Sequence, residues 1–285
     1  MEAAALLEPG SPLFLRNESA VFAGIRRTDP HDVVTPYGYG GPVGTPFWDE
    51  YHEWCRTNRI VTTFVRFHPL YANHRDAPPF VHVERLAGTI AWRLDQDDLF
   101  AGMHRHHRRI VRKAEGIDTT MTRGPSTLDG FVPLYERTMD RKDASGFYYF
   151  PPEYWHALAE LDDRIVLFEA GDDAALLCFA TPPWLHYHLG ATSDEGRKRG
   201  VSNLLFYEAA RWAAAEGFTR FHLGGGLGGG EDSLFEFKLR FDPGGVLEMA
   251  VGKVIHDEDA YRALGGAGTE GFFPAYRRAA STVRA

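Results

Sequence analysis

A run of basic residues ending in a glycine stands directly before a segment with the pattern of a long helix. The run is Arg197-Lys198-Arg199-Gly200-Val201-Ser202, and the helix is expected over residues 202–216. Glycine lets a backbone approach a phosphate closely, and the first turn of a helix offers unpaired N–H groups at the positive end of its dipole. These residues predict a phosphate-binding loop, and the alternative is a solvated loop before an ordinary helix.

A second cationic feature lies on a predicted amphipathic helix. Asp97 is a suitable N-cap and Gly116 a suitable stop for a helix of about 98–115. At about 100° per residue, one side is apolar and the other cationic. The apolar side holds Leu99, Met103, Ile110 and Ala114, and the cationic side holds Arg105, Arg108, Arg109 and Arg112. The arginines are a candidate contact for nucleic-acid phosphates, and the alternative is a solvated face.

Three consecutive glycines end a predicted strand and precede a short helix that carries a lysine. The glycines are Gly224-Gly225-Gly226, and Asp232 can cap a helix over 233–240, which contains Phe237 and Lys238. Such glycines indicate a backbone that another group approaches closely, although glycines alone also describe a flexible loop. Asp232 and Glu236 are candidate proton acceptors, and no residue is compelling as a general base.

The histidines and cysteines do not predict a metal site. His104, His106 and His107 would point in different directions on a helix without a nearby cysteine or carboxylate, so we expect solvated side chains. His186 and His188 alternate on a predicted strand and share one face, which fits a cleft wall and a hydrogen-bonded core pair equally. The two cysteines, Cys55 and Cys178, have apolar neighbours and are expected to be buried free thiols.

Composition sets limits on the class of protein. The 285 residues suffice for one large domain or two small ones, and 44% hydrophobic with 25% charged residues is typical of soluble globular proteins. No apolar run approaches the ~18 residues of a membrane helix. The first sixteen residues lack the features of a signal peptide, so we expect a cytoplasmic protein without a membrane span. The net charge of −8 means that any nucleic-acid partner must be held by a local basic patch.

Alternating strand and helix patterns predict an α/β fold with a mixed sheet (α+β). The N-terminal region to about Pro46 is rich in glycine and proline and includes the aromatic loop 36–42. Further helices are expected over 47–55, 129–141 and 152–161, the last with Pro152 in its first turn. Strands are expected near 60–67, 80–86, 88–94, 164–170, 174–181, 184–192, 218–223 and 246–255, and a polar loop over 193–200.

Several of these motifs resemble known acyltransferases. GNAT enzymes carry a similar Q/R-x-x-G-x-G/A loop between a strand and a helix, although Ser202 replaces the last small residue. Fem-family enzymes, which are related to GNAT proteins and use aminoacyl-tRNA, show an L-G-G-G stretch before a helix bearing F-K-x-x-F, as at 223–226 and 237–241 here. The loop 36–42, the basic stretch 108–114 and the helix 135–141 also resemble that family, so the resemblance covers roughly 32–255.

The resemblance implies two GNAT-like units in tandem, with acceptor binding in residues 1–120 and donor binding with catalysis in residues 121–285. It implies transfer of an amino acid from tRNA to an amine, which needs neither cofactor nor metal because the ester is already activated. Lys238, with Phe237, would stabilise the carbonyl oxygen as charge builds. The donor would contact Arg197, Lys198, Arg199, Gly200, Ser202, Gly224, Gly225, Gly226, Arg105, Arg108, Arg109 and Arg112, and the acceptor would contact Tyr37, Gly38, Tyr39, Gly40 and Arg141.

The acceptor stays open at this point. Fem enzymes that build cell-wall cross-bridges are usually longer, and this chain resembles short members such as the alanyl transferases of pacidamycin-type antibiotic assembly. The acceptor is therefore a peptide, a cell-wall precursor or a carrier-bound antibiotic intermediate. Two other functions are retained: an acyl-CoA N-acyltransferase with its pyrophosphate in the 197–202 loop, and a non-catalytic tRNA- or nucleotide-binding module.

Overall fold

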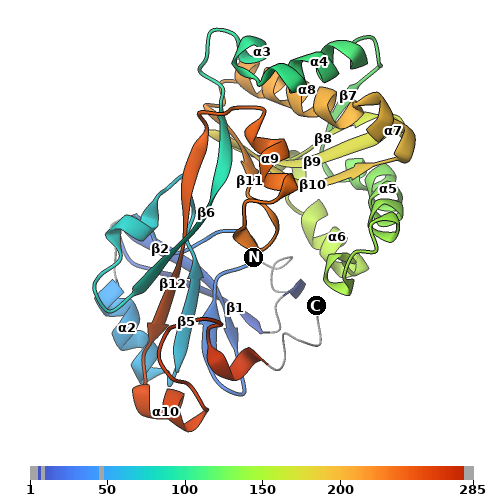
Figure 1. The fold of residues 1–285 in the computed structure, drawn as a ribbon. Helices are drawn as coiled ribbons and strands as arrows, with labels where there is room; N and C mark the ends of the chain where they lie inside the picture. The colour runs from blue at the N-terminus through green and yellow to red at the C-terminus, as the bar shows by residue number, and fades with distance from the viewer. Residues whose placement is uncertain (1–5, 8–9, 45–47, 279–285) are drawn as a thin grey trace. The chain divides into compact units, whose positions relative to one another are not determined.

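The computed structural model describes residues 6–7, 10–44 and 48–278, and they form a mixed α/β fold (Figure 1). Parallel and antiparallel strand pairs occur in the same sheet, which confirms the predicted fold class. Two compact units can be distinguished, Ala87–Leu247 and Met1–Leu86 with Glu248–Ala285. The strands β6 (His82–Arg93) and β12 (Val246–Ile255) each have residues in both units.

This division differs from the predicted boundary between residues 120 and 121. Residues 87–120 belong with the following segment because β6 pairs with β11 (Arg220–Gly224) and because the helices after β6 pack against α8 (Val201–Ala215). Residues after 247 belong with the N-terminal segment because β12 pairs with β5 (Thr62–Arg66). Neither relation is visible in local sequence, since each joins segments more than 80 residues apart.

The unit Ala87–Leu247 has a sheet between two helical layers. After β6 the strand order is β11 (Arg220–Gly224), β10 (Trp184–Thr192), β9 (Ala174–Thr181), β8 (Ile165–Ala170) and β7 (Thr120–Arg123), with only β10 and β11 parallel. In Figure 1, α4 (Arg105–Ala114) and α8 (Val201–Ala215) cover one side of this sheet, and α5 (Leu128–Arg141) and α6 (Pro152–Ala159) cover the other. The first layer encloses an apolar core that includes Trp92, Phe206, Phe221 and Phe241, each worth about 1.5–3 kcal/mol when buried.

The second unit is built on a sheet in the order β1 (Ser11–Arg16), β2 (Ala20–Arg27), β3 (Asp32–Val34), β5 (Thr62–Arg66) and β12, with β4 (Val43–Gly44) beside β2. Its described helices include α2 (Trp48–Thr57) and α10 (Glu258–Ala263). The strands before residue 45 were not predicted, because glycine and proline interrupt their apolar alternation. Some predictions fall partly outside the described residues. These residues are 1–5 of the segment examined for a signal peptide, Pro46 at the end of the glycine-rich region, and Phe47 of the predicted 47–55 helix.

Four predictions of local structure are wrong. The helix expected over 98–115 is two helices, α3 (Leu99–Gly102) and α4, because Met103 and His104 adopt extended backbone angles. Asp98, not Asp97, caps α3. The strands expected at 80–86 and 88–94 are the single strand β6. The loop expected over 193–200 contains the helix α7 (Asp194–Arg199), whose N-cap Ser193 accepts a hydrogen bond from the Gly196 amide.

Two further expectations concern burial and membranes. Cys55 and Cys178 are buried free thiols, as predicted, and burial raises the pKa of the Cys55 thiol to about 12. Within the described ranges, none of the helices combines the length and apolar character that crossing a membrane requires.

Candidate functional site

The candidate site lies in the unit Ala87–Leu247, where the parallel strands β10 and β11 stop pairing. Their registered pairs run from Trp184 with Arg220 to His186 with His222 and go no further. The register of β10 against β9 shifts between Tyr187 and Leu189, and that of β11 against β6 shifts after His222. Beyond His186, the backbone N–H and C=O groups on the facing edges of β10 and β11 therefore do not pair with one another. The glycine stretch begins at this point.

Lys238 connects three elements at this place. It lies on α9 (Ser233–Leu239), is only 5% exposed, and its Nζ donates a hydrogen bond to the Gly225 carbonyl at 2.6 Å. The ammonium also lies 5.7 Å from the ring centroid of Tyr187, on β10. The lysine and the glycines that the motif predicted are thus brought together by direct contact.

The glycines are required by the close approach of the loop to its neighbours. Gly224 has φ of +77°, a left-handed conformation that favours glycine. A Cβ on Gly226 would lie 2.2 Å from the Gly230 carbonyl oxygen and 2.3 Å from Oδ1 of Asp232. A Cβ on Gly225 would lie 3.1 Å from the Gly88 carbonyl oxygen. The loop that presents a carbonyl to Lys238 therefore depends on the absence of side chains.

Asp232 holds this loop and the start of α9. Its carboxylate accepts hydrogen bonds from the backbone amides of Leu227, Leu234 and Phe235, at 2.9–3.1 Å. These hydrogen bonds lower the pKa of Asp232, so the carboxylate stays ionised and occupied. The predicted N-cap is confirmed, and the arrangement favours a positioning role over the predicted role as proton acceptor. Glu236, the other candidate, is exposed on α9.

The environment of Lys238 suits a group that changes its proton at moderate pH. Burial lowers the pKa of Lys238 to about 8, partly offset by the negative charge of Asp232. Near neutral pH, Lys238 is therefore protonated in most molecules, and its ammonium can donate hydrogen bonds. A buried ammonium at fixed geometry is able to stabilise negative charge that develops on an acyl oxygen.

Phe237 and His107 fasten α9 to α4. Phe237 packs against the rings of His107, Phe206 and Phe241, with centroids 5.1–5.7 Å away. His107 is 1% exposed, and its Nε2 donates to the Phe237 carbonyl at 2.9 Å. The prediction of a solvated His107 is wrong, and its spacing from Val111 and Ala114 on the buried side of α4 is the signal that would have shown this. These contacts fit a positioning role for Phe237.

The other histidines lie among aromatic rings. His188 stacks on Phe179 with a centroid distance of 4.4 Å, and its Nε2 lies 2.5 Å from the Tyr154 hydroxyl. The His186 ring is 5.6 Å from the ring of His222. Burial lowers the pKa of His186 to about 4 and of His188 to about 3, so both are neutral at pH 7. Among the residues described here, no three His, Cys, Asp or Glu side chains are grouped to hold a metal ion.

Each side chain of the basic run 197–199 on α7 is paired with a carboxylate. Arg197 lies 3.5 Å from Asp194, Lys198 lies 2.7 Å from Glu195, and Arg199 lies 2.5 Å from Asp173. Gly200 ends α7 with φ of +75°, and a Cβ there would lie 2.3 Å from Cγ2 of Ile110 on α4. The Ser202 hydroxyl lies 2.7 Å from that of Thr192. The motif thus has a structural role, and its phosphate contact stays a prediction.

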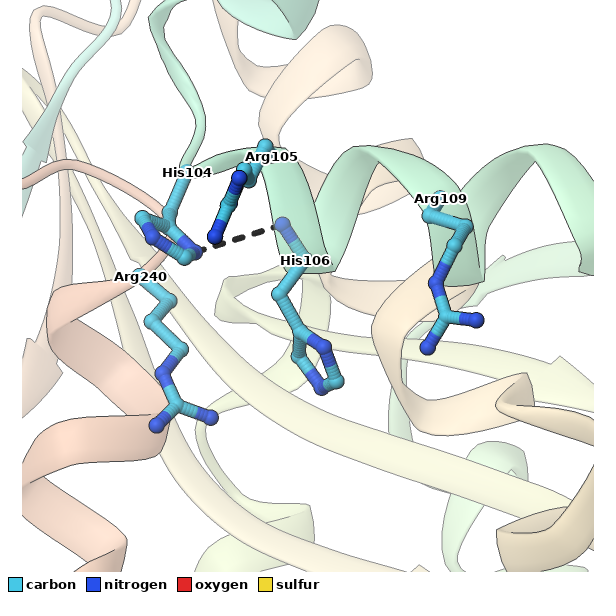
Figure 2. Close-up of a pocket in the computed structure, with 5 residues that line it drawn as sticks. All are labelled: His104, Arg105, His106, Arg109 and Arg240. Atoms are coloured by element: carbon cyan, nitrogen blue, oxygen red, sulfur yellow. Dashed lines mark hydrogen bonds between the residues drawn. The ribbon is translucent and has the colours of Figure 1, made fainter.

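The structure divides the four predicted arginines of the cationic helix into two pairs. Arg108 donates to the Ala101 carbonyl at 3.4 Å, and the Arg112 guanidinium lies 5.0 Å from the Phe100 ring centroid. Arg105 and Arg109 instead line a pocket of about 600 Å³. The pocket is completed by His104, His106 and Arg240, the residue that follows α9 (Figure 2).

The predicted acceptor residues are placed on separate elements. Tyr37, Gly38, Tyr39 and Gly40 form a loop between β3 and β4 of the second unit, and Tyr37 is 38% exposed. Gly40 is pinned by its amide to the Arg66 carbonyl at 2.7 Å and by its carbonyl to Asn73 at 2.9 Å. Arg141 ends α5 in the unit Ala87–Leu247, where its Nε lies 3.5 Å from Asp194. Their role with an acceptor stays a prediction.

Comparisons with known proteins identify the fold. Residues 101–238 match the family model described as acetyltransferase (GNAT) domain. No curated protein matches the sequence. The structure of FemX is similar with a TM-score of 0.67 and 14% identity, over 92% of each chain.

Two other solved structures are similar at a comparable level. L-PGS from Bacillus licheniformis gives a TM-score of 0.61 and 15% identity, over 88% of this chain and 86% of that chain. The C-terminal domain (DUF2156) of a protein assigned as a lysylphosphatidylglycerol synthetase, from Agrobacterium fabrum, gives 0.61 and 16%, over 92% and 90%. The chain therefore has a GNAT fold, and the match over 101–238, which ends at Lys238, supports an acyltransferase.

Proposed function

We propose that this chain is an aminoacyltransferase that moves an amino acid from aminoacyl-tRNA to the amine of an acceptor. The amine nitrogen attacks the ester carbonyl carbon, an amide bond forms, and the C–O bond to the tRNA ribose breaks. The amine loses one proton in the process, and the departing ribose hydroxyl takes one up. Because the ester is already activated, the residues of the chain only need to orient both substrates and stabilise charge on the carbonyl oxygen.

The observation that carries this proposal is the setting of Lys238. Its ammonium is buried, held by the Gly225 carbonyl at 2.6 Å, and located where β10 and β11 stop pairing. In this setting one N–H bond positions the lysine and the others remain to donate to an acyl oxygen. The same lysine lies in the F-K-x-x-F stretch that resembles Fem enzymes, and the fold similarity to FemX supports the same reading.

The rival donor, an acyl-CoA, is less well supported by the site. Its pyrophosphate would be expected at the 197–202 loop, where each basic side chain already has a carboxylate partner and Ile110 occupies the space beside Gly200. The tRNA ester makes no such demand on this loop. We further propose that the loop 37–40 and Arg141 contact the acceptor, a peptide, a cell-wall precursor or an antibiotic intermediate, and that transfer takes place in the cytoplasm, where aminoacyl-tRNA is made.

The test is a donor comparison with the purified full chain. tRNA charged with a radiolabelled amino acid, alanine first, and radiolabelled acetyl-CoA are each offered with the same panel of peptide, nucleotide-linked and uridyl-peptide amines. We expect label from aminoacyl-tRNA in an amide product that survives mild base, which hydrolyses the ester. Transfer from acetyl-CoA alone would replace the proposal with the CoA reaction. Binding of tRNA without any product would replace it with a non-catalytic module.

A further inference from the structure

A strongly cationic pocket lies at the N-terminal end of α4, apart from the contacts that Lys238 makes. It has a volume of about 600 Å³ and is lined by His104, Arg105, His106, Arg109 and Arg240. Figure 2 shows His106 and Arg109 extending from the same side of α4, with Arg240 reaching toward the same space from the end of α9. None of the described residues that line the pocket is a carboxylate, and residues 99–114 contain neither aspartate nor glutamate.

The guanidinium groups of this pocket lack the partners that most other arginines of the unit have. Arg197 and Arg199 pair with carboxylates, Arg108 donates to a carbonyl, and Arg112 lies over an aromatic ring. Within the described part of the chain, Arg105, Arg109 and Arg240 have no ion pair and no side-chain hydrogen bond. Three such cations around one pocket, in a chain of net charge −8, indicate a site for an anion.

Imidazoles add directed hydrogen-bond donors to these charges. The Nδ1 of His104 accepts a hydrogen bond from the His106 amide at 3.2 Å, so the neutral ring carries its proton on Nε2. His106 responds to the same positive surroundings: partial burial and the charges of Arg240 and Arg109 lower its pKa. Planar guanidiniums with imidazole N–H groups match the several acceptor oxygens of a phosphate.

The pocket is fixed to the helix that carries Lys238, on a different side of it. The His104 amide donates to the Arg240 carbonyl at 2.9 Å, and His107 donates to the Phe237 carbonyl at 2.9 Å. Arg240 is the C-cap of α9 and keeps helical backbone angles two positions after Lys238. Side chains two positions apart on a helix do not face each other, so Lys238 and Arg240 point in different directions. A helix is about 10–12 Å across, and stacked nucleotides rise about 3.4 Å each, so about three nucleotides span this width.

We propose that this pocket binds backbone phosphates near the 3′ end of the tRNA, about three nucleotides from the esterified ribose, with Arg105, Arg109 and Arg240 as the phosphate ligands. The inference rests on the proposed function for the identity of the donor. It adds Arg240, His104 and His106 to the donor contacts. It also assigns different roles to the two pairs of arginines on α4. Arg108 and Arg112 contribute general positive charge, whereas Arg105 and Arg109 hold specific phosphates.

The experiment measures binding of a fluorescent, deacylated acceptor-stem minihelix with its single-stranded 3′ end to the full chain. The pocket variants are Arg105→Gln/Arg109→Gln and Arg240→Gln. The comparator is Arg108→Gln/Arg112→Gln, which removes the same charge from the same helix, and Arg137→Gln/Arg211→Gln removes two arginines elsewhere in the unit. We expect Arg240→Gln to raise Kd about 10-fold, the scale of one charge-assisted hydrogen bond, and the double variant to raise Kd about 100-fold. Each variant should also flatten the salt dependence by about one unit of log–log slope per arginine.

Two additional probes test the position of the phosphates and the source of the anion. A minihelix without its single-stranded 3′ end is expected to bind weakly and to be insensitive to the pocket variants. Coenzyme A and inorganic pyrophosphate are offered as competitors, and only weak competition is expected. Melting temperatures of the variants confirm that each remains folded.

The outcomes separate this inference from the proposed function. Equal weakening by the pocket pair and the Arg108/Arg112 pair would overturn the pocket in favour of diffuse charge. Unchanged minihelix binding in the pocket variants would overturn it as well, even if the wild-type chain transfers amino acids from tRNA. Tight competition by coenzyme A that depends on the pocket arginines would assign the pocket to a small nucleotide instead. Pocket-dependent minihelix binding in a chain that forms no amide would sustain the pocket and defeat the transfer.

Discussion

Lys238 is almost completely buried, which is unusual for a lysine, and its ammonium is oriented by a hydrogen bond to one backbone carbonyl. Burial disfavours the charged form, which lowers the pKa to about 8. Among the described residues, no carboxylate forms an ion pair with this ammonium, and the Asp232 carboxylate accepts hydrogen bonds from three backbone amides instead. The positive charge is therefore available to a substrate.

The first prediction concerns the charge of Lys238. Lys238→Met keeps the length and burial of the side chain and removes its charge and donors. We expect kcat for aminoacyl transfer to fall by ~10²-fold or more, the scale of losing one donor to a developing oxyanion. Steady-state kinetics with a saturating acceptor measure this, and Lys113→Met, on the exposed side of α4, serves as the matched control. Near-normal turnover in Lys238→Met would remove the lysine from the mechanism.

The second prediction concerns pH. If the ammonium form stabilises the transition state, kcat/KM falls as pH rises through the pKa of Lys238, about 8. Activity on the acid side rises with deprotonation of the acceptor amine, so the profile has a maximum. The descending limb should be missing from the residual activity of Lys238→Met, after subtraction of spontaneous ester hydrolysis. If kcat/KM of the wild-type protein keeps rising to pH 9.5, Lys238 would instead act in its neutral form, as a proton acceptor.

At the scale of elements, the junction of α7 and α8 is built around one glycine. Gly200 combines a left-handed backbone with contact to Ile110 of α4, and Ser202 bonds to Thr192 at the end of β10. The junction thereby joins a helix of one side of the sheet to the strand that carries Tyr187. A pattern typical of phosphate loops is explained here by helix packing.

The third prediction tests this packing. Gly200→Ala is expected to destabilise the protein by about 1–3 kcal/mol, the cost of a side chain at a positive φ, with the clash against Ile110 in addition. Ile110→Ala should relieve the clash and not the strain. In a double-mutant cycle measured by urea unfolding, the two substitutions together should therefore cost less than the sum of the single ones. Strictly additive values would show that α4 does not approach Gly200 closely.

At the scale of the molecule, burial lowers the pKa of several described histidines, and four of them are shifted strongly. Burial brings the pKa of His107 and His186 to about 4 and that of His188 and His256 to about 3. The unfolded chain takes up these protons near pH 6.5 and the folded chain only below about 4. The contribution of the neutral rings to stability is therefore complete above pH 6.5 and declines as pH falls toward 4.

The fourth prediction follows from that sign. The melting temperature should be constant from pH 8 to 7 and should fall measurably between pH 6.5 and 5, before most carboxylates titrate. His188→Gln, which retains a partner for the Tyr154 hydroxyl, should be less stable at pH 7.5 and show a shallower decline. A melting temperature that stays level from pH 7.5 to 5 would contradict the lowered pKa values.

The fifth prediction concerns the residues that are proposed to contact the acceptor. Tyr39→Ala and, separately, Arg141→Ala should raise KM for the acceptor about 10-fold with little change for aminoacyl-tRNA, since losses of uniform binding appear in KM. Tyr71→Ala is the control, because Tyr71 contacts the same His68 ring as Tyr39. A rise in the donor KM would mean that the two substrates are assigned the wrong way round.

Much of the local structure of the site follows from sequence. The predicted strands 184–192 and 246–255 coincide with β10 and β12, and Asp232 caps α9 as expected. The glycines at 224–226 marked a backbone in close contact, which proved to be contact with Lys238, Gly230 and Asp232. These features follow from alternation, capping and glycine geometry, which act between residues a few positions apart.

Only the tertiary structure decided which charges are available and which side chains are buried. The predicted helix is interrupted at Met103 and His104, and His107 is buried in the core. Of the four arginines on α4, only Arg105 and Arg109 line the pocket. Arg240 joins the first pair only because α4 bonds to the end of α9, more than 130 residues away. Ion pairs with Asp194 and Asp173 neutralise the charges of Arg197 and Arg199. Lys238 lies where the pairing of β10 with β11 ends, which also depends on the tertiary structure. Burial and charge compensation depend on packing between distant segments, and no local pattern specifies that packing.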